Sequence, residues 1–285
     1  EDNMLGDAVA YRDERTSGMY AVADAIVSPD EVYRRTGIQR QPFNTIYQLL
    51  ALQREHPEQI ENAETFLMIP DYLAFLLTGT KANEYTNAST TCLMNARTQQ
   101  WDETILEAFD IPRSIFCDVV MPGTEEKIGY PTHIIAPATH DTGSAYLAVP
   151  ARDADAVFLS SGTWSLLGVE NEGPITSDAS RFQNFTNEGG FELRFRFLKN
   201  IMGLWMIQSI RRELNGVSYV EGKDTHQQAG EDELPPFTHE AIEWGFPDLI
   251  AHAKEADSFE AHVNVNDDRF LAPNSMIDEI RRACF

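Results

Sequence analysis

The sequence predicts an α/β protein with two domains. Its 285 residues exceed the usual size of one domain, and a hydrophobic content of 42% is enough for a buried core. Helical patterns fill most of residues 28–109, whereas short strand-like apolar runs recur between residues 132 and 197. Helices and strands combined along one chain in this way are typical of an α/β fold.

The helices of the first half have recognisable start and end signals. Ser28 and Pro29 form a typical cap and first turn, and Gly37 a typical end. Pro70 and Gly79 bracket another helix by the same rules. The four expected helices cover residues 28–37, 43–56, 70–79 and 101–109, and the polar tract 87–91 (NASTT) is expected to be a solvated loop.

Strands are expected in the second half. Residues 132–136 (THIIA) predict a buried strand, and residues 156–159 and 164–169 predict a hairpin around the turn 160–163. In residues 191–197 (FELRFRF), Phe and Leu alternate with Glu and Arg, which predicts a strand that buries its apolar side chains. Residues 187–190 are expected to form the turn before it, and residues 199–200 to interrupt the pattern after it.

The last part of the chain predicts two main helices, with a polar loop and one further helix between them. Residues 216–240 are expected to be a surface loop, and residues 247–256 an additional helix. The two main helices cover residues 201–214 and a segment that starts at residue 274. Their inward apolar side chains are expected to be Leu204, Ile207, Ile210 and Leu214 in the first and Met276, Ile277 and Ile280 in the second.

The residues suited to chemistry lie between residues 134 and 167. Asp141 follows an apolar run, and ligands gather at the carboxyl ends of strands in α/β folds. Residues 141–144 (DTGS) are expected to form a loop that enters a helix over residues 145–148. The turn 160–163 (SSGT) offers consecutive backbone N–H groups as an anion nest, to which Thr163 adds a hydroxyl. A carboxylate and an anion-binding turn suit transfer of a phosphoryl group to an alcohol, which indicates a sugar kinase.

The composition argues against several classes of partner. A net charge of -23 opposes binding to nucleic acid or to an anionic membrane, so a phosphate ligand must be held locally. No apolar run reaches the roughly 18 residues of a membrane helix. The three cysteines are widely spaced, which fits a reducing compartment, and we expect a cytoplasmic location.

The motifs exclude other chemistries. Walker-type, GxGxxG, CxxC and HExxH motifs are absent, and the seven His are scattered, so a metal centre built from protein imidazoles is not expected. Ser144, His140 and Asp141 could be read as a hydrolase triad, but the GxSxG motif is absent and adjacent residues rarely form a triad.

Several segments resemble the FGGY carbohydrate kinases of the actin-like ATPase superfamily. The most informative are THDTGSA at residues 139–145 and FLSSGTWSLLG at residues 158–168. The resemblance spans almost the whole chain, and NEGG together with LKNIMGLW is typical of members that phosphorylate L-rhamnulose. The chain departs from the family pattern at Gly143, where Ala is more usual, and at Gln48 and Ala51, where Lys and Trp are usual.

The resemblance implies two actin-like (ribonuclease H-like) domains with mixed sheets flanked by helices. Residues 1–144 would be part of a sugar-binding domain and residues 145–285 part of an ATP-binding domain, both incomplete. Asp141 would be the general base that takes the proton of the sugar 1-hydroxyl as it attacks the γ-phosphorus. The further roles implied are sugar contacts for His140, Thr142 and Asn200, and ATP contacts for Gly162, Thr163 and Gln208.

The implied activity is ATP-dependent phosphorylation of L-rhamnulose to L-rhamnulose 1-phosphate, with Mg²⁺ bridging the phosphates. The implied partners are the small-molecule sugar and ATP, with no nucleic acid and no membrane, and monomer and homodimer both remain open. Two alternatives also remain open. One is a kinase for another ketose, such as xylulose or fuculose, and the other is a non-catalytic sugar-binding protein. The family's N-terminal phosphate-binding hairpin and adenine-binding part are expected upstream of Glu1 and beyond Phe285.

Overall fold

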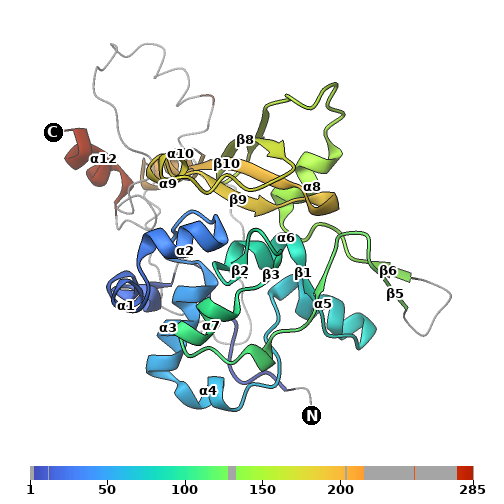
Figure 1. Cartoon of the computed structure of the whole chain (residues 1–285). Helices are drawn as coiled ribbons and strands as arrows, with labels where there is room; N and C mark the ends of the chain where they lie inside the picture. The colour runs from blue at the N-terminus through green and yellow to red at the C-terminus, as the bar shows by residue number, and fades with distance from the viewer. Residues whose placement is uncertain are drawn as a thin grey trace, which may run out of the picture. The chain divides into compact units, whose positions relative to one another are not determined.

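A computed structural model describes residues 3–11, 13–127, 133–202, 204–214, 247 and 275–284 (Figure 1). The chain divides into two compact units. The larger unit comprises residues 1–160 and 166–200, and the smaller unit comprises residues 161–165 and 201–285. The domain boundary between residues 144 and 145 stays a prediction.

Seven α-helices lie between residues 19 and 108 of the larger unit. Ser28 caps α2, because its hydroxyl accepts the N–H of Glu31 at 3.3 Å. Gly37 and Gly79 end α2 and α5 in the left-handed conformation, with φ of 69° and 74°. The four expected helices are therefore confirmed, although α3 and α7 begin two residues later than expected, at Thr45 and Glu103. The observed helices are α1 (Met19–Ile26), α2 (Pro29–Thr36), α3 (Thr45–Glu55), α4 (Pro57–Glu61), α5 (Ile69–Thr78), α6 (Tyr85–Ala88) and α7 (Glu103–Ala108).

A hydrophobic core holds these helices together. It includes Ile46 and Leu50 of α3, Leu93, and Ile105 and Leu106 of α7. The tract 87–91 lies against this core and is not a solvated loop, so that prediction was wrong. It continues α6 into a 3-10 helix, Ser89–Thr91, whose hydroxyls donate to backbone carbonyls one turn earlier. These local hydrogen bonds let short polar side chains be buried.

Three small sheets belong to this helical part. β1 (Asn83–Glu84) pairs in parallel with β4 (Val119–Val120), and β2 (Met94–Asn95) pairs antiparallel with β3 (Gln100–Trp101). β5 (Glu125–Lys127) pairs antiparallel with β6 (His133–Ile135). β6 confirms the expected strand, but Ile135 is 60% exposed, so the expectation of a buried strand was wrong.

A four-stranded sheet follows, with strand order β7-β8-β10-β9. β7 (Phe158–Ser161) and β8 (Ser165–Asn171) confirm the expected hairpin. β9 (Thr186–Gly189) and β10 (Phe195–Ile201) are antiparallel, with Arg196 opposite Glu188. α8 (Asp141–Ala148) precedes this sheet in the chain, and α9 (Asp178–Phe182) lies between β8 and β9.

The strands around residue 190 differ from the expectation. Residues 187–189 are strand rather than turn, and residues 191–193 form a 3-10 helix in which Glu192 and Leu193 have positive φ. Lys199 and Asn200 continue β10 instead of interrupting it. Arg196 is 0% exposed, although the alternation placed it on the outer face. Its buried partners, described below, override the local pattern.

Asn187 connects β9 to the end of α2. Its backbone N–H and its side-chain amide both donate to the carbonyl oxygen of Gly37, at 2.8 and 3.0 Å. The same side chain exchanges hydrogen bonds with the backbone of Ile175, and it is 1% exposed. Asn187, which the sequence places in a turn, is therefore buried and connects β9 to Gly37 and Ile175 by hydrogen bonds.

The smaller unit packs α10 (Leu204–Leu214) against α12 (Met276–Cys284), and Met276 is buried as expected. Trp205, Met206 and Ser209 form the buried side of α10. Ile210 packs against this cluster as expected, whereas Ile207 and Leu214 are exposed, so the prediction was wrong for these two. The expected loop at 216–240 and the expected helix at 247–256 lie outside the described residues, apart from residue 247.

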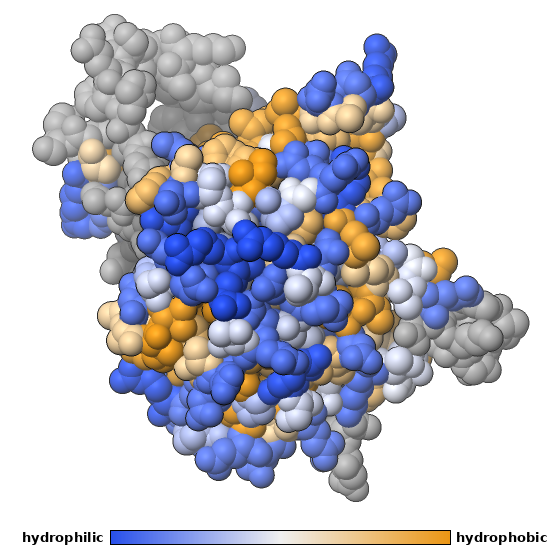
Figure 2. Space-filling view, in the orientation of Figure 1, coloured by the Kyte–Doolittle hydropathy of each residue, from blue (hydrophilic) through white to orange (hydrophobic). Residues whose placement is uncertain are grey.

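The visible face of the molecule is largely hydrophilic, in keeping with the net charge of -23, with hydrophobic areas between (Figure 2). Apolar side chains that are exposed include Leu73, Leu76 and Leu77 of α5. Within the described ranges, none of the helices has the length and apolar content needed to span a membrane.

Candidate active site

Asp141 occupies the first position of α8. His140 precedes it as N-cap residue, so residues 141–144 begin the helix and do not form the loop that the sequence suggested. The carboxylate Oδ1 accepts the N–H of Thr142 at 2.7 Å, and the side chain is 99% exposed. A carboxylate in the first turn is stabilised by the helix dipole. Asp141 thus presents an oriented and accessible anionic group.

Glu84 holds the segment before Asp141 in place. Its carboxylate accepts the N–H and the hydroxyl of Thr139, at 3.0 and 2.6 Å, and the hydroxyl of Thr86 at 2.6 Å. Thr86 in turn accepts the backbone N–H of His140 at 3.2 Å. Glu84 is 2% exposed, and hydrogen bonds to a charged acceptor of this kind are the strong ones. The backbone that carries Asp141 is therefore fixed to β1 and α6.

His140 lies against two buried charged residues of the four-stranded sheet. Arg196 Nη1 is 3.0 Å from His140 Nδ1, and Glu188 Oε2 is 3.8 Å from His140 Nε2. Arg196 also donates from Nε to the carbonyl oxygen of Gly189 at 3.0 Å. Burial lowers the pKa of His140, and burial also lowers the pKa of Arg196, while the charge of Glu188 opposes both shifts.

Thr142 and Gly143 face the interior of the larger unit. Thr142 is 2% exposed, and its hydroxyl lies 3.4 Å from Asp141 Oδ1. A Cβ atom at Gly143 would lie 3.2 Å from the Cβ of Ala138 and 3.5 Å from Cζ of Arg196. Glycine thus lets α8 approach these residues closely. Contact of Thr142 with a sugar stays a prediction.

Asn200 lies on β10, four residues after Arg196. Side chains alternate along a strand, so Arg196 and Asn200 are on the same face, roughly 13 Å apart along the strand. The Asn200 amide donates to Gln39 Oε1 at 3.1 Å, and Gln39 is buried. Asn200 and residues 140–142 all belong to the larger unit.

The predicted ATP contacts lie in the smaller unit. Gly162 and Thr163 are exposed in the turn between β7 and β8, and Gln208 is half-buried on α10. The N–H of Gly162 donates to the carbonyl oxygen of Trp164 at 2.8 Å, and the N–H of Trp205 donates to Thr163 O at 3.2 Å. One N–H of the expected anion nest is thus already used, and the turn is attached to the start of α10.

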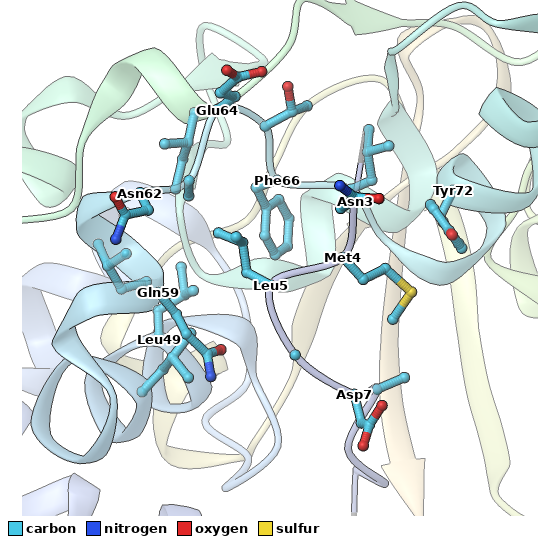
Figure 3. Close-up of a pocket in the computed structure, with 18 of the residues that line it drawn as sticks. Asn3, Met4, Leu5, Asp7, Leu49, Gln59, Asn62, Glu64, Phe66 and Tyr72 are labelled. Atoms are coloured by element: carbon cyan, nitrogen blue, oxygen red, sulfur yellow. The ribbon is translucent and has the colours of Figure 1, made fainter. Parts of the chain in front are cut away.

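A cavity of about 490 Å³ lies away from these residues in the larger unit. It is lined by residues 3–8 and by side chains such as Leu49, Phe66 and Tyr72 (Figure 3). None of the predicted site residues lines it. A cavity of about 240 Å³ is bordered by Glu84 and Thr139 but is otherwise mostly apolar. In the described part of the chain, no group of three or more His, Cys, Asp or Glu side chains is arranged to hold a metal ion.

The sequence interpretation missed Glu84, Glu188, Arg196 and Gln39. All four are polar and buried. The contacts that connect them to the site are made with Thr139, His140 and Asn200, which lie far away in the chain, so spacing within a window gives no sign of them.

Known proteins resemble the chain over nearly its whole length. Residues 1–142 match the model of the FGGY family of carbohydrate kinases, N-terminal domain. A protein named rhamnulokinase from Oceanobacillus iheyensis is 46% identical over 99% of this chain and 56% of its own length. A rhamnulokinase from Yersinia pestis is 42% identical over 98% of this chain and 53% of its own length. The chain spans about half the length of the curated relatives it matches.

Solved structures share its fold. A ligand-bound xylulose kinase from Lactobacillus acidophilus superposes with a TM-score of 0.64 and 21% identity, covering 75% of this chain and 45% of that one. A gluconate kinase from the same organism gives a TM-score of 0.63 and 20% identity, covering 73% and 44%. The chain has the actin-like α/β fold of these sugar kinases, and it belongs to the FGGY family of carbohydrate kinases.

Proposed function

We propose that the protein transfers the γ-phosphoryl group of ATP to the 1-hydroxyl of L-rhamnulose, giving L-rhamnulose 1-phosphate. The observation that carries this proposal is the 46% identity to a protein named rhamnulokinase over 99% of this chain. The exposed carboxylate of Asp141 supports it, because a carboxylate in reach of a hydroxyl is the usual base in such a transfer. The compartment we propose is the cytoplasm.

Asp141 would remove the proton of the attacking hydroxyl. The N–H of Thr142 and the N-terminus of α8 orient Oδ1, and the exposed carboxylate can accept a hydrogen bond from a substrate. Imidazole and amide groups supply directional hydrogen bonds, so His140 and Asn200 would hold the other sugar hydroxyls. Thr142 would contact a sugar hydroxyl beside them.

The turn at Gly162 and Thr163 and the side chain of Gln208 would contact ATP. Exposed backbone N–H groups and a hydroxyl are suited to phosphate oxygens. When bound, Mg²⁺ would reduce the negative charge of the phosphate groups and keep much of its water. An exposed carboxylate such as that of Asp141 fits such a hydrated ion.

The role of Asp141 is tested by Asp141→Asn in the full-length protein. The Asn side chain can still accept the Thr142 N–H, so the change removes basicity with little change of shape. We expect kcat to fall about 100-fold or more, in line with general base catalysis. The matched control is Asp153→Asn, an exposed carboxylate in a loop, which should leave kcat unchanged. A loss below roughly tenfold for Asp141→Asn contradicts the assignment.

A panel of ketoses tests the substrate. Coupled assays with L-rhamnulose, xylulose and fuculose should give the highest kcat/KM for L-rhamnulose. A higher value for another ketose would replace the proposed substrate and keep the kinase. Calorimetry that finds sugar binding, combined with no turnover of any sugar, would instead favour a binding protein.

A further inference from the structure

The side-chain amides of Gln39 and Asn200 form a hydrogen-bonded pair, called the amide pair below. Asn200 Nδ2 donates to Gln39 Oε1 at 3.1 Å, although 161 residues separate the two in the chain. Gln39 follows α2, Asn200 lies near the end of β10, and both belong to the larger unit. The hydrogen bond therefore joins the helical part of this unit to its four-stranded sheet.

The amide pair lies where one face of β10 becomes accessible. Side chains alternate along a strand, so Arg196, Leu198 and Asn200 share a face. Arg196 and Leu198 are each 0% exposed, whereas Asn200 is half-buried. On the same face, Arg196 Nη1 lies 3.0 Å from His140 Nδ1. The face of β10 that meets the residue before Asp141 thus ends at the amide pair.

The backbone before Gln39 is fixed to the same sheet. Gly37 ends α2 with φ of 69°, and its carbonyl oxygen accepts two hydrogen bonds from Asn187 of β9. A Cβ atom at residue 37 would lie 2.9 Å from Nδ2 of Asn187, so this close approach requires glycine. Ile38 is buried in the hydrophobic core. Gln39 therefore contacts Asn200 from a segment that is held on both sides.

The amide pair leaves one hydrogen-bond donor and one acceptor unused. A side-chain amide has an oxygen that accepts and an NH₂ group that donates. Since Asn200 Nδ2 is bound to Gln39 Oε1, the unused groups are Asn200 Oδ1 and Gln39 Nε2, and neither forms another hydrogen bond within the described residues. If both amides were turned over, one oxygen and one NH₂ group would again be unused. The count does not depend on how the amides are oriented.

A hydroxyl group matches these two unused groups. It has one O–H donor and two acceptor lone pairs, so it can donate to Oδ1 of Asn200 and accept from Nε2 of Gln39 at the same time. A carboxylate only accepts and would leave the amide oxygen unpaired, whereas an ammonium group only donates and would leave the NH₂ group unpaired. The amide pair is therefore suited to a neutral ligand with hydroxyl groups.

We propose that the amide pair binds one hydroxyl group of the ketose, and that Gln39 is a specificity-determining residue of the sugar site. The proposal rests on the proposed function in taking a ketose as the ligand. The bound hydroxyl is a different one from the 1-hydroxyl that Asp141 would activate. Because it does not react, its hydrogen bonds stabilise the bound sugar and the transition state alike.

The direct test is a crystal structure of the full-length protein with L-rhamnulose bound. We expect one hydroxyl oxygen of the sugar within about 3.2 Å of a side-chain amide atom of Asn200 and of Gln39. A sugar that contacts Asn200 and not Gln39, or that contacts neither, overturns the proposal. This test requires no variant, so a failure of folding cannot obscure it.

Two substitutions distinguish contact with the sugar from mere support of Asn200. In Gln39→Glu, a carboxylate oxygen can still accept from Asn200 Nδ2, but the NH₂ group is lost. Gln39→Met removes both functions and keeps a similar shape. We expect both variants to raise KM for L-rhamnulose about tenfold or more and to change kcat less than about threefold, as loss of uniform binding predicts.

Gln183→Glu is the matched control for the added charge, because Gln183 is exposed on the larger unit. It should leave KM unchanged. A wild-type KM in Gln39→Glu, together with a raised KM in Gln39→Met, would mean that Gln39 only holds Asn200 in place. That result contradicts contact between Gln39 and the sugar.

Monodeoxy analogues of L-rhamnulose, each lacking one hydroxyl, test the same contact from the side of the ligand. For one analogue, kcat/KM in the wild type should be about tenfold or more below that of L-rhamnulose, because the amide groups are left unpaired. In Gln39→Met the same comparison should give a difference below about threefold. Equal losses in both proteins for every analogue contradict the proposal.

Calorimetry without ATP separates this proposal from the proposed function. If no ketose is phosphorylated, but L-rhamnulose binds and Gln39→Glu weakens its binding about tenfold, the proposed function fails and the role of the amide pair remains. If L-rhamnulose is phosphorylated and KM is unchanged in both Gln39 variants, the role of the amide pair fails alone.

Discussion

The hydroxyl of Thr139 donates to the Glu84 carboxylate at 2.6 Å, although 55 residues separate the two in the chain. Glu84 lies on β1 and Thr139 stands two residues before Asp141, so one buried carboxylate connects the helical core to the candidate base. The position of Asp141 therefore depends on a residue that does not belong to the site itself.

Replacing Glu84 by Gln should destabilise the protein and reduce its activity. An amide would direct an NH₂ group at donors that now meet a carboxylate, which leaves buried N–H or O–H groups without acceptors. We expect the free energy of unfolding in urea to fall by about 2–4 kcal/mol. Glu58→Gln is the control, because that side chain is 61% exposed. A loss below about 1 kcal/mol would show that the carboxylate charge is not required.

Asp71 should make stability depend on pH. Burial raises its pKa from 3.8 to about 6, despite hydrogen bonds from Asn83, Glu84 and Met68. A raised carboxyl pKa means that the folded state binds the proton more tightly than the unfolded state. The contribution to stability is therefore complete below about pH 4 and is lost as pH rises through about 6.

The measurement is the pH dependence of unfolding in the wild type and in Asp71→Asn. Between about pH 4 and about pH 7, the wild type should lose about 3 kcal/mol relative to the variant, an order-of-magnitude value from the shift of about two units. The difference in slope matters, because Asn also alters the hydrogen bonds at every pH. Parallel curves for the two proteins would contradict the raised pKa.

Gly189→Ala should be strongly destabilising. A Cβ atom there would lie 2.5 Å from Cε1 of Tyr85, whose ring is 1% exposed and cannot move aside freely. Overpacking of this kind costs about 1–3 kcal/mol or more. Gly173→Ala is the matched control, since nothing lies within 4 Å of its Cβ position. Thermal unfolding of the two variants compares their melting temperatures, and that of Gly189→Ala should be the lower. Equal melting temperatures would exclude the close packing.

Tyr146→Phe should be tolerated. The Tyr146 hydroxyl is buried and has no hydrogen-bond partner within the described residues, while its ring stacks on Phe158 at 4.5 Å. Removing an unsatisfied polar group and keeping the ring is expected to change the free energy of unfolding by about 0 to +1 kcal/mol. Urea denaturation checks this, and a loss above about 1 kcal/mol would mean that the hydroxyl has a buried partner after all.

The local signals of the sequence were sufficient for the main helices. Ser28 caps α2, and Gly37 and Gly79 adopt the left-handed conformation that ends α2 and α5. These features depend on a few neighbouring residues, so they can be read without knowledge of the fold. The β7-β8 hairpin was equally accessible, because its two apolar runs flank a short polar turn.

The buried polar residues could not be predicted in the same way. Arg196 looks like an outward-facing strand residue until Glu188 and His140 are brought next to it. Tract 87–91 looks like a loop until its hydroxyls are seen to donate to the backbone of their own turn. The roles of Asp141, His140, Thr142, Asn200, Gly162, Thr163 and Gln208 stay predictions, because they concern ligands rather than the fold.

The hydrogen bonds between Asn187 and Gly37 have a consequence for how the protein folds. The two residues are 150 positions apart, and the buried Gly37 carbonyl accepts two hydrogen bonds from Asn187. Closing such a long loop is entropically costly and slow, so α2 can form early but gains this partner late. During synthesis, some 150 further residues must be added after Gly37 before Asn187 can contact it. In a ribosome-bound chain that ends before Asn187, the end of α2 should be cleaved more readily by proteases.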